Sequence, residues 1–242
     1  MQKEIRAVLA LAAQLCAGKL PASGAKIANY TAASLVARQH DTMQLQLTTT
    51  DSAERLNTIY GVQLPSDWAP GDSIKYGKHC LIIRLDQGGR RQAMLRRMLG
   101  AVDALMIDKK WLESTARKVC QCIIPINGYR VCSGNTWYEV TMTDDSLMHC
   151  AGICEGWQSK DGGSREGVVL LTTGANVLLA PLHNKMPVLL HQRELDSWLQ
   201  GERPIPQELN RIASPYPSEL MQVEQCVTQH SNRSKVRIVS SA

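Results

Sequence analysis

The segment Ala180–Val188 carries the side chain best suited to acid–base chemistry, His183. The segment reads Ala-Pro-Leu-His-Asn-Lys-Met-Pro-Val, so Pro181 and Pro187 restrict the backbone on both sides of the histidine. An imidazole held in this way can give or take a proton near neutral pH. The alternative interpretation is a histidine whose hydrogen bonds are satisfied within a loop.

Eight cysteines could in principle act as nucleophiles or metal ligands. Cys120-x-Cys122 lacks the two-residue spacer that zinc knuckles favour. Alternation along a strand places Cys120 and Cys122 on one face, and Cys150 and Cys154 on one face, as expected for small buried thiols. We therefore expect reduced cysteines in a cytoplasmic protein, with no metal and no other cofactor. The eight are Cys16, Cys80, Cys120, Cys122, Cys132, Cys150, Cys154 and Cys226.

Basic side chains gather at Arg90, Arg91, Arg96 and Arg97. Apolar residues between Leu95 and Met106 recur at helical spacing, so residues 90–106 are predicted to form a helix that begins within this cluster. Positive charge at a helix N-terminus opposes the macrodipole. The cluster is either a solvated helix face or a patch that contacts phosphates.

The composition is that of a globular protein. The 242 residues have a net charge of +5, 44% hydrophobic residues and no Phe. This balance excludes collagen, coiled coils and disulfide miniproteins, and no apolar run is long enough to predict a membrane helix. Walker A, dinucleotide-binding, metalloprotease and nucleophile-elbow motifs are absent from the sequence. We expect a single domain over residues 1–242, and an N-terminal helix rather than a secretion signal.

The pattern of turns and apolar runs predicts a helical first part and a strand-rich second part. The strands follow one another through short turns such as Asn127-Gly128, which is typical of hairpins. The predicted fold class is therefore α+β, with a mostly antiparallel, barrel-like sheet and flanking helices. Residues 202–242 are expected to form a loop-rich tail. Helices are predicted at 3–18, 31–39, 175–180 and 193–200, and strands at 43–48, 79–85, 121–126, 129–132, 136–142, 147–155, 167–172 and 186–190.

Four segments, in order and in register, resemble the SOS response-associated peptidase (SRAP) family, best over residues 120–200. Cys122–Cys132 (Cys-Ile-Ile-Pro-Ile-Asn-Gly-Tyr-Arg-Val-Cys) is similar to the family's Cys-Leu-Ile-Pro-Ala-Asx-Gly-aromatic-aromatic-Glu-Trp block. Ala151–Trp157, Leu171–Asn176 and Ala180–Val188 resemble its next three elements. Trp198-Leu199 resembles the tryptophan helix that follows.

This resemblance implies a barrel-like α+β fold with a positively charged cleft for single-stranded DNA. In the family, an N-terminal cysteine captures the ring-opened aldehyde of an abasic site as a covalent DNA–protein crosslink, assisted by a glutamate, an asparagine and a histidine. His183 matches that histidine. The residues expected to bind DNA are Arg90, Arg91, Arg96, Arg97, Arg130, Trp157, Asn184 and Lys185.

The sequence departs from the family pattern where this chemistry takes place. Gln2 stands in place of the cysteine, and Val131 in place of the glutamate. Cys132 occupies the position of the motif tryptophan, and Lys185 that of the motif arginine. The family's Asn-Ala-Arg segment has no clear match near residues 100–104.

Three hypotheses follow from these departures. The favoured one is a divergent, phage-related SRAP-like protein that binds single-stranded or abasic-site DNA in the SOS response with impaired crosslinking. The second is a thiol-dependent enzyme that uses Cys132 and His183. The third is a non-catalytic interaction protein.

Overall fold

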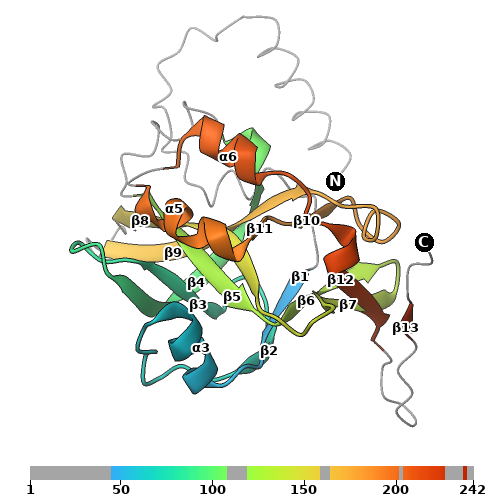
Figure 1. Ribbon diagram of the computed structural model, residues 1–242, viewed down its shortest axis with the longest axis horizontal. Coiled ribbons are helices and arrows are strands. Elements are labelled where there is room, and N and C mark those ends of the chain that lie inside the picture. Colours follow the sequence, from blue (N-terminus) through green and yellow to red (C-terminus); the bar gives the residue numbers. More distant parts are fainter. Residues whose placement is uncertain (1–44, 108–118, 159–163, 202–203, 227–236, 239–242) are drawn as a thin grey trace, which may run out of the picture.

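The computed structural model describes residues 45–107, 119–158, 164–201, 204–226 and 237–238. Strands predominate in this part of the chain and form two sheets (Figure 1). The helices expected at 3–18 and 31–39 lie outside the described residues. Among the described residues, no helix is long and apolar enough to cross a membrane.

The first sheet has six strands among the described residues, and every pairing in it is antiparallel. Its centre is β6, which lies between β1 and β7. Figure 1 shows β6, β7 and β12 to one side of the molecule, away from β3, β4 and β9. In spatial order the strands are β13 (Arg237–Ile238), β12 (Met221–Gln225), β7 (Thr136–Met142), β6 (Gly128–Ser133), β1 (Leu45–Thr49) and β2 (Gly71–Ile74).

The second sheet closes on itself, because β8 pairs with β9 as well as with β5. The closed ring is β9-β4-β3-β5-β8, and it confirms the barrel-like α+β prediction. Among the described strands, β4 and β9 form the one parallel pair. In spatial order the strands are β10 (Lys185–Pro187), β9 (Ser164–Gly174), β4 (Arg91–Asp103), β3 (His79–Leu85), β5 (Val119–Ile126), β8 (Met148–Gln158) and β11 (Leu189–Leu190).

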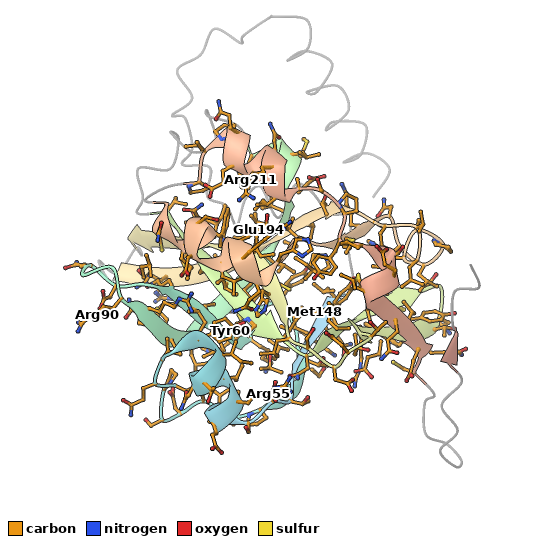
Figure 2. All side chains as sticks on the ribbon, viewed as in Figure 1. Arg55, Tyr60, Arg90, Met148, Glu194 and Arg211 are labelled. Carbon is orange, nitrogen blue, oxygen red and sulfur yellow. The ribbon has the colours of Figure 1, made fainter. Side chains whose placement is uncertain are left out.

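The helices are short and pack against the outside of this ring. Helix α3 begins after Ser52, whose side chain accepts a hydrogen bond from the Arg55 backbone N–H, and it ends at Gly61 in the left-handed conformation. In Figure 2, Arg211 of α6 lies near Glu194, with which it forms an ion pair at 2.7 Å. The helices are α3 (Ala53–Tyr60), α5 (Leu195–Gln200) and α6 (Pro206–Ile212), and the 3-10 turns are η1 (Ala104–Met106), η2 (Gln192–Glu194) and η3 (Ser218–Leu220).

The ring strands are buried on both faces, which explains their continuous apolar runs. Leu81 and Ile83 of β3 pack with the helices, in a cluster that includes Tyr60 and Trp198. Ile82, between them, belongs to a second cluster shared with strands of the six-stranded sheet. Burial of alternate residues in two cores stabilises both faces of the ring.

The helix predicted for residues 90–106 is wrong. Residues Arg91–Asp103 form the strand β4, which pairs with β3 on one side and β9 on the other. Met98 and Val102 are both buried but pack in different cores, because the register of β4 shifts between Met98 and Gly100. The turn at Asp86 joins β3 to β4: the Asp86 carboxylate accepts hydrogen bonds from the backbone N–H groups of Gly88 and Arg90. The hairpin pairing outweighs the helix propensity of Leu, Met and Arg.

Three further expectations change. Gly128 does not turn β6 back onto β5; β5 lies in the ring and β6 in the other sheet, so Asn127 marks a corner. A Cβ on Gly128 would lie 2.5 Å from the Val140 carbonyl oxygen, so this close approach requires glycine. Residues 177–182 form turns instead of a helix. The expected loop-rich tail contains α6, η3 and β12.

Candidate functional site

His183 sits at the end of a tight turn that leads into β10. The backbone N–H groups of Leu182 and His183 both donate to the Leu179 carbonyl, at 2.8 and 2.9 Å. The Asn176 side chain fixes the start of the turn: its oxygen accepts from the Leu179 N–H, and its nitrogen donates to the Tyr216 carbonyl. The motif Leu171–Asn176 therefore builds the support for the histidine.

The imidazole of His183 folds back onto its own loop. The backbone N–H of Lys185 donates to His183 Nδ1 at 3.0 Å. The Lys185 carbonyl oxygen lies 3.2 Å from the same nitrogen. Both contacts are made at Nδ1, so Nε2 is the ring nitrogen available to a ligand. His183 is half-buried.

Beside His183, the Lys185 ammonium forms an ion pair with the Asp103 carboxylate. Asp103 ends β4, and its other oxygen accepts from the Leu105 backbone N–H at 2.9 Å, which caps η1. Both side chains are largely shielded, with 32% of the Lys185 and 17% of the Asp103 side chain exposed. Screening by solvent is therefore weaker here than at the open surface.

Strand β9 explains how these distant residues meet. Thr172 of β9 lies opposite Asp103 in the parallel pair and opposite Pro187 in the antiparallel pair. The β4 and β10 strands thus flank the same end of β9. The sheet edge brings Asp103, His183 and Lys185 into one cluster, which we call the Asp103 cluster.

The four arginines expected to form one basic patch are held separately. Arg90 pairs with Asp86 at the tip of the β3–β4 hairpin and points outward in Figure 2. Arg91 pairs with Asp196 at 2.5 Å, and Arg96 with Glu166 at 2.7 Å. Arg97 is exposed. On a strand, neighbouring residues face opposite sides, so Arg96 and Arg97 do not share a surface.

The Glu166 carboxylate bridges two arginines of the ring strands. Arg84 and Arg96 lie 3.3 and 2.7 Å from its two carboxylate oxygens. Burial disfavours the charged carboxylate, but the Arg96 hydrogen bond and the two guanidinium charges outweigh it and lower the pKa of Glu166. These two arginines are thus partly neutralised within the fold.

Cys132 and Arg130 lie on one face of β6, opposite to that of Val131. Val131 is 1% exposed and packs in the core, as its alternate position requires. The Cys132 thiol lies 3.4 Å from the Gly134 carbonyl. Among the described residues, no hydrogen bond joins Cys132 to His183, the two residues that the thiol-enzyme hypothesis would use.

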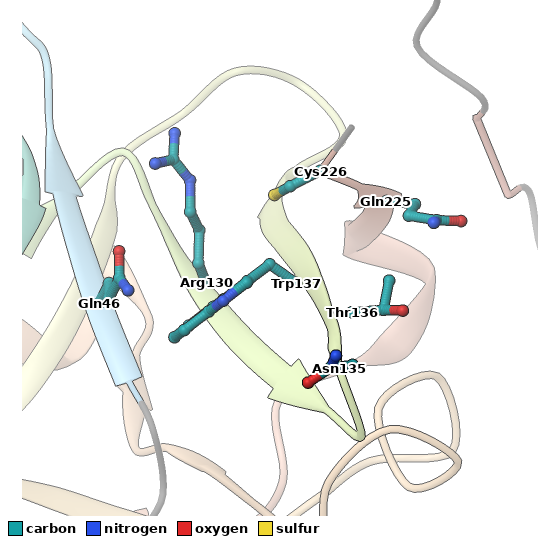
Figure 3. Close-up of a pocket in the computed structure, with 7 residues that line it drawn as sticks. All are labelled: Gln46, Arg130, Asn135, Thr136, Trp137, Gln225 and Cys226. Atoms are coloured by element: carbon teal, nitrogen blue, oxygen red, sulfur yellow. The ribbon is translucent and has the colours of Figure 1, made fainter. Parts of the chain in front are cut away.

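Arg130 lines a cavity of about 330 Å³ on the six-stranded sheet (Figure 3). Its guanidinium is held by Glu139, with atoms 3.1 and 3.2 Å apart. Figure 3 shows the Trp137 ring beside Arg130, with Gln46 across from them. The remaining lining residues are Asn135, Thr136, Gln225 and Cys226.

The other two residues expected to bind DNA are Trp157 and Asn184. Trp157 lies in β8 opposite Arg165 of β9, and its side chain is outside the described set. Asn184 is exposed, and its carbonyl accepts from the Ala175 backbone N–H at 3.0 Å.

The cysteines of β5 and β8 behave as buried thiols. Cys120 and Cys154 lie directly opposite each other in the β5–β8 pair. A hydrogen bond that the Cys120 thiol donates to Cys154, together with burial, raises the pKa of Cys120. Burial raises the pKa of Cys80 to about 12. Among the described residues, no group of three His, Cys, Asp or Glu side chains is arranged to hold a metal ion.

A family model described as SOS response associated peptidase (SRAP) matches residues 80–232. The chain belongs to the SRAP family. This confirms the motif resemblance.

Curated relatives include two from Bacillus subtilis (strain 168). "Abasic site processing protein YoqW" is 28% identical over 105 residues, which cover 42% of this chain and 47% of the relative. "Abasic site processing protein YoaM" is 26% identical over 87 residues, which cover 36% of this chain and 38% of the relative. YoqW also occurs in Bacillus phage SPbeta. The chain thus spans less than half the length of the curated relatives it matches.

Solved structures confirm the fold. A protein from Bordetella bronchiseptica superposes with a TM-score of 0.63 at 15% identity, covering 76% of this chain and 100% of that one. A protein from Bacteroides thetaiotaomicron superposes with a TM-score of 0.61 at 20% identity, covering 74% of this chain and 90% of that one. A second protein from Bordetella bronchiseptica, described as phage-related, superposes with a TM-score of 0.55 at 14% identity, covering 76% of this chain and 94% of that one.

Sequence reasoning did not single out Asp103, which the structure places against Lys185. Asp103-Ala104 lies within the region where the family's Asn-Ala-Arg segment was sought, and aspartate has the shape of asparagine. Its proximity to Lys185, which the ion pair establishes, identifies it as part of the cluster.

Proposed function

We propose that this chain binds single-stranded DNA that carries abasic sites, with the Asp103 cluster at the lesion. The observation that carries the proposal is the half-buried Lys185–Asp103 pair beside His183 in an SRAP fold. The pair supplies a cation for phosphate, and the imidazole supplies a hydrogen-bond donor for the sugar. The setting we propose is the SOS response in the cytoplasm.

The relatives support a DNA lesion as the ligand. Those matched by this chain are named abasic site processing proteins. The net charge of +5 favours a polyanionic partner. Exposed basic side chains such as Arg90 and Arg97 lie on β4 or at its start, and β4 leads to Asp103.

We propose further that the crosslinking reaction of the family is impaired in this chain. The carboxylate that assists in the family is replaced by Val131, which is buried at 1% exposure and cannot donate or accept a proton. Loss of a general acid–base group typically costs about 10²–10⁴ in rate. Binding without efficient capture by the family route is the expected outcome.

Two gels with the same samples test this proposal. The full chain is mixed with a labelled single strand that holds one abasic site, and with an intact strand of the same sequence. A native gel should show a shift that weakens as salt rises, and a denaturing gel without reductant should show little or no stable adduct. No native shift with either strand would refute DNA binding. If the denaturing gel showed as much covalent adduct as the native gel shows bound DNA, impaired crosslinking would be refuted.

A further inference from the structure

We propose that the Lys185 amine condenses with the aldehyde of an abasic site and forms an imine between this chain and DNA. The inference rests on the proposed function, because it names the reacting group at the same cluster. A primary amine is an established nucleophile toward carbonyl carbon. The motif position of Lys185 holds an arginine in the family pattern quoted above, and a guanidinium does not lose its proton in proteins.

The surroundings of Lys185 suit this reaction better than those of the other described lysines. Residues described by the structure include Lys75, Lys78 and Lys185. Lys75 and Lys78 are exposed, and neither is among the described ion pairs. Lys185 is half-buried, is oriented by Asp103 and lies two residues from His183. It therefore has a fixed position and a carboxylate within hydrogen-bond distance that can accept its proton.

The step balances without an oxidant, a reductant or a cofactor. Asp103 takes one proton from the Lys185 ammonium, and the freed electron pair on Nζ forms a bond to the aldehyde carbon. The carbonyl oxygen becomes an alkoxide, to which the His183 Nε2–H group can donate a hydrogen bond. A proton passes from nitrogen to that oxygen, giving a carbinolamine. Asp103 then returns its proton as the C–O bond breaks, and water and a protonated imine are formed.

Reductive trapping tests the inference. The full chain is incubated with the labelled abasic strand, with and without sodium borohydride, and run on a denaturing gel. We expect a band that depends on borohydride, because reduction converts the reversible imine to a stable amine. Lys185→Arg keeps the charge for phosphate and removes the nucleophile, so the trapped band should fall about tenfold or more. Lys78→Arg is the matched control and should trap as the unchanged chain does.

Binding is measured on the same proteins with a native gel, so that the two proposals can fail separately. No native shift with the unchanged chain overturns the proposed function. A native shift with no trapped band, or with a band that Lys185→Arg leaves intact, overturns the role of Lys185 and leaves DNA binding standing. Mass mapping of the reduced adduct provides a second measurement that does not depend on a variant. It should place the added mass on residue 185, and a mass on another amine overturns the inference.

Discussion

The Lys185 ammonium and the Asp103 carboxylate meet across strand β9, although 82 residues separate them in the sequence. The pairing fixes the position of the ammonium, and it neutralises part of the positive charge that the proposed DNA ligand would meet. Asp103 therefore affects the two proposed roles of Lys185 in opposite ways. It competes with phosphate for the cation, and it is the base that frees the amine.

Replacing Asp103 by Asn should separate these roles. Asp103→Asn keeps the shape and the cap of η1 but removes the negative charge. Single-stranded DNA should bind a few-fold tighter, since a part-exposed ion pair is worth up to about 1 kcal/mol. The borohydride-trapped band should weaken, because no carboxylate takes the proton. Affinity by anisotropy and trapping by gel measure the two effects. A parallel change of both in one direction would contradict this division of roles.

The contact between the buried Tyr60 and the half-buried His149 predicts a pH-dependent stability. The Tyr60 hydroxyl oxygen lies 2.5 Å from His149 Nδ1, and the rings pack edge to face. Burial lowers the pKa of His149 from 6.5 to about 4, against a smaller opposing effect of Gln192. Between pH 6.5 and 4, the His149 imidazole binds a proton in the unfolded chain but not in the folded one. The free energy of unfolding therefore falls as the pH falls from about 6.5 to 4. The predicted loss is roughly 3 kcal/mol.

Urea unfolding measured across this pH range checks the prediction. His149→Gln should flatten the slope between pH 6.5 and 4. The matched control is His79→Gln, since His79 is exposed at the start of β3. It should keep the slope of the unchanged chain. An unchanged slope in the His149 variant would assign the pH dependence to other groups.

Trp198 ties helix α5 to the ring through one hydrogen bond. Its indole N–H donates to the Cys122 carbonyl at 2.9 Å, and the side chain is fully buried. Trp198→Phe leaves that carbonyl without the indole donor and should lower the unfolding free energy by about 1–3 kcal/mol. Trp137→Phe, on a half-buried ring in β7, should cost less. Equal losses in the two variants would show that the hydrogen bond contributes nothing.

Thiol labelling tests the hypothesis that this chain is an enzyme that uses Cys132. Burial raises the pKa of Cys80 to about 12 and also raises that of Cys150, so these thiols should resist iodoacetamide in the folded state. Of the described cysteines, the half-buried Cys132 and Cys226 should be alkylated first. Alkylation of Cys132 should leave DNA binding and borohydride trapping unchanged. Loss of either activity on labelling of Cys132 alone would favour the thiol enzyme.

Much of the strand-rich part of the fold could be predicted from the sequence, because its signals are local. The strands at 79–85 and 136–142 have the predicted bounds, since apolar runs with β-branched residues or aromatics are flanked by turns. The short helix that contains Trp198 also ends at Gln200, as predicted.

The wrong predictions arise where pairing between strands that are far apart in the sequence determines the local conformation. In β4, residues Met98 and Val102 fit both a helical and a strand period, so the pattern alone favoured the wrong element. Its partners β3 and β9 settle the conformation, and β9 lies about 70 residues further along the chain. Asn127-Gly128 indicated a bend correctly, but a local signal does not tell a hairpin from a corner between two sheets.

The candidate site was predicted in part. His183 and Lys185 were found because they lie within a motif. Asp103 was not, because its place in the site depends on the parallel β4–β9 pair. The expected grouping of arginines at 90–97 followed from the wrong helix, and the pairing with Asp86, Asp196 and Glu166 replaces it.

The most direct test of the account is the affinity of the Asp103 cluster for DNA. Fluorescence anisotropy would compare an abasic single strand with an intact one, for the unchanged chain and for Lys185→Glu, with Lys78→Glu as the matched charge control. We predict tighter binding to the abasic strand, and a larger loss of affinity in Lys185→Glu than in Lys78→Glu on that strand. Equal affinity for both strands, with equal losses in the two variants, would contradict a lesion site at the Asp103 cluster.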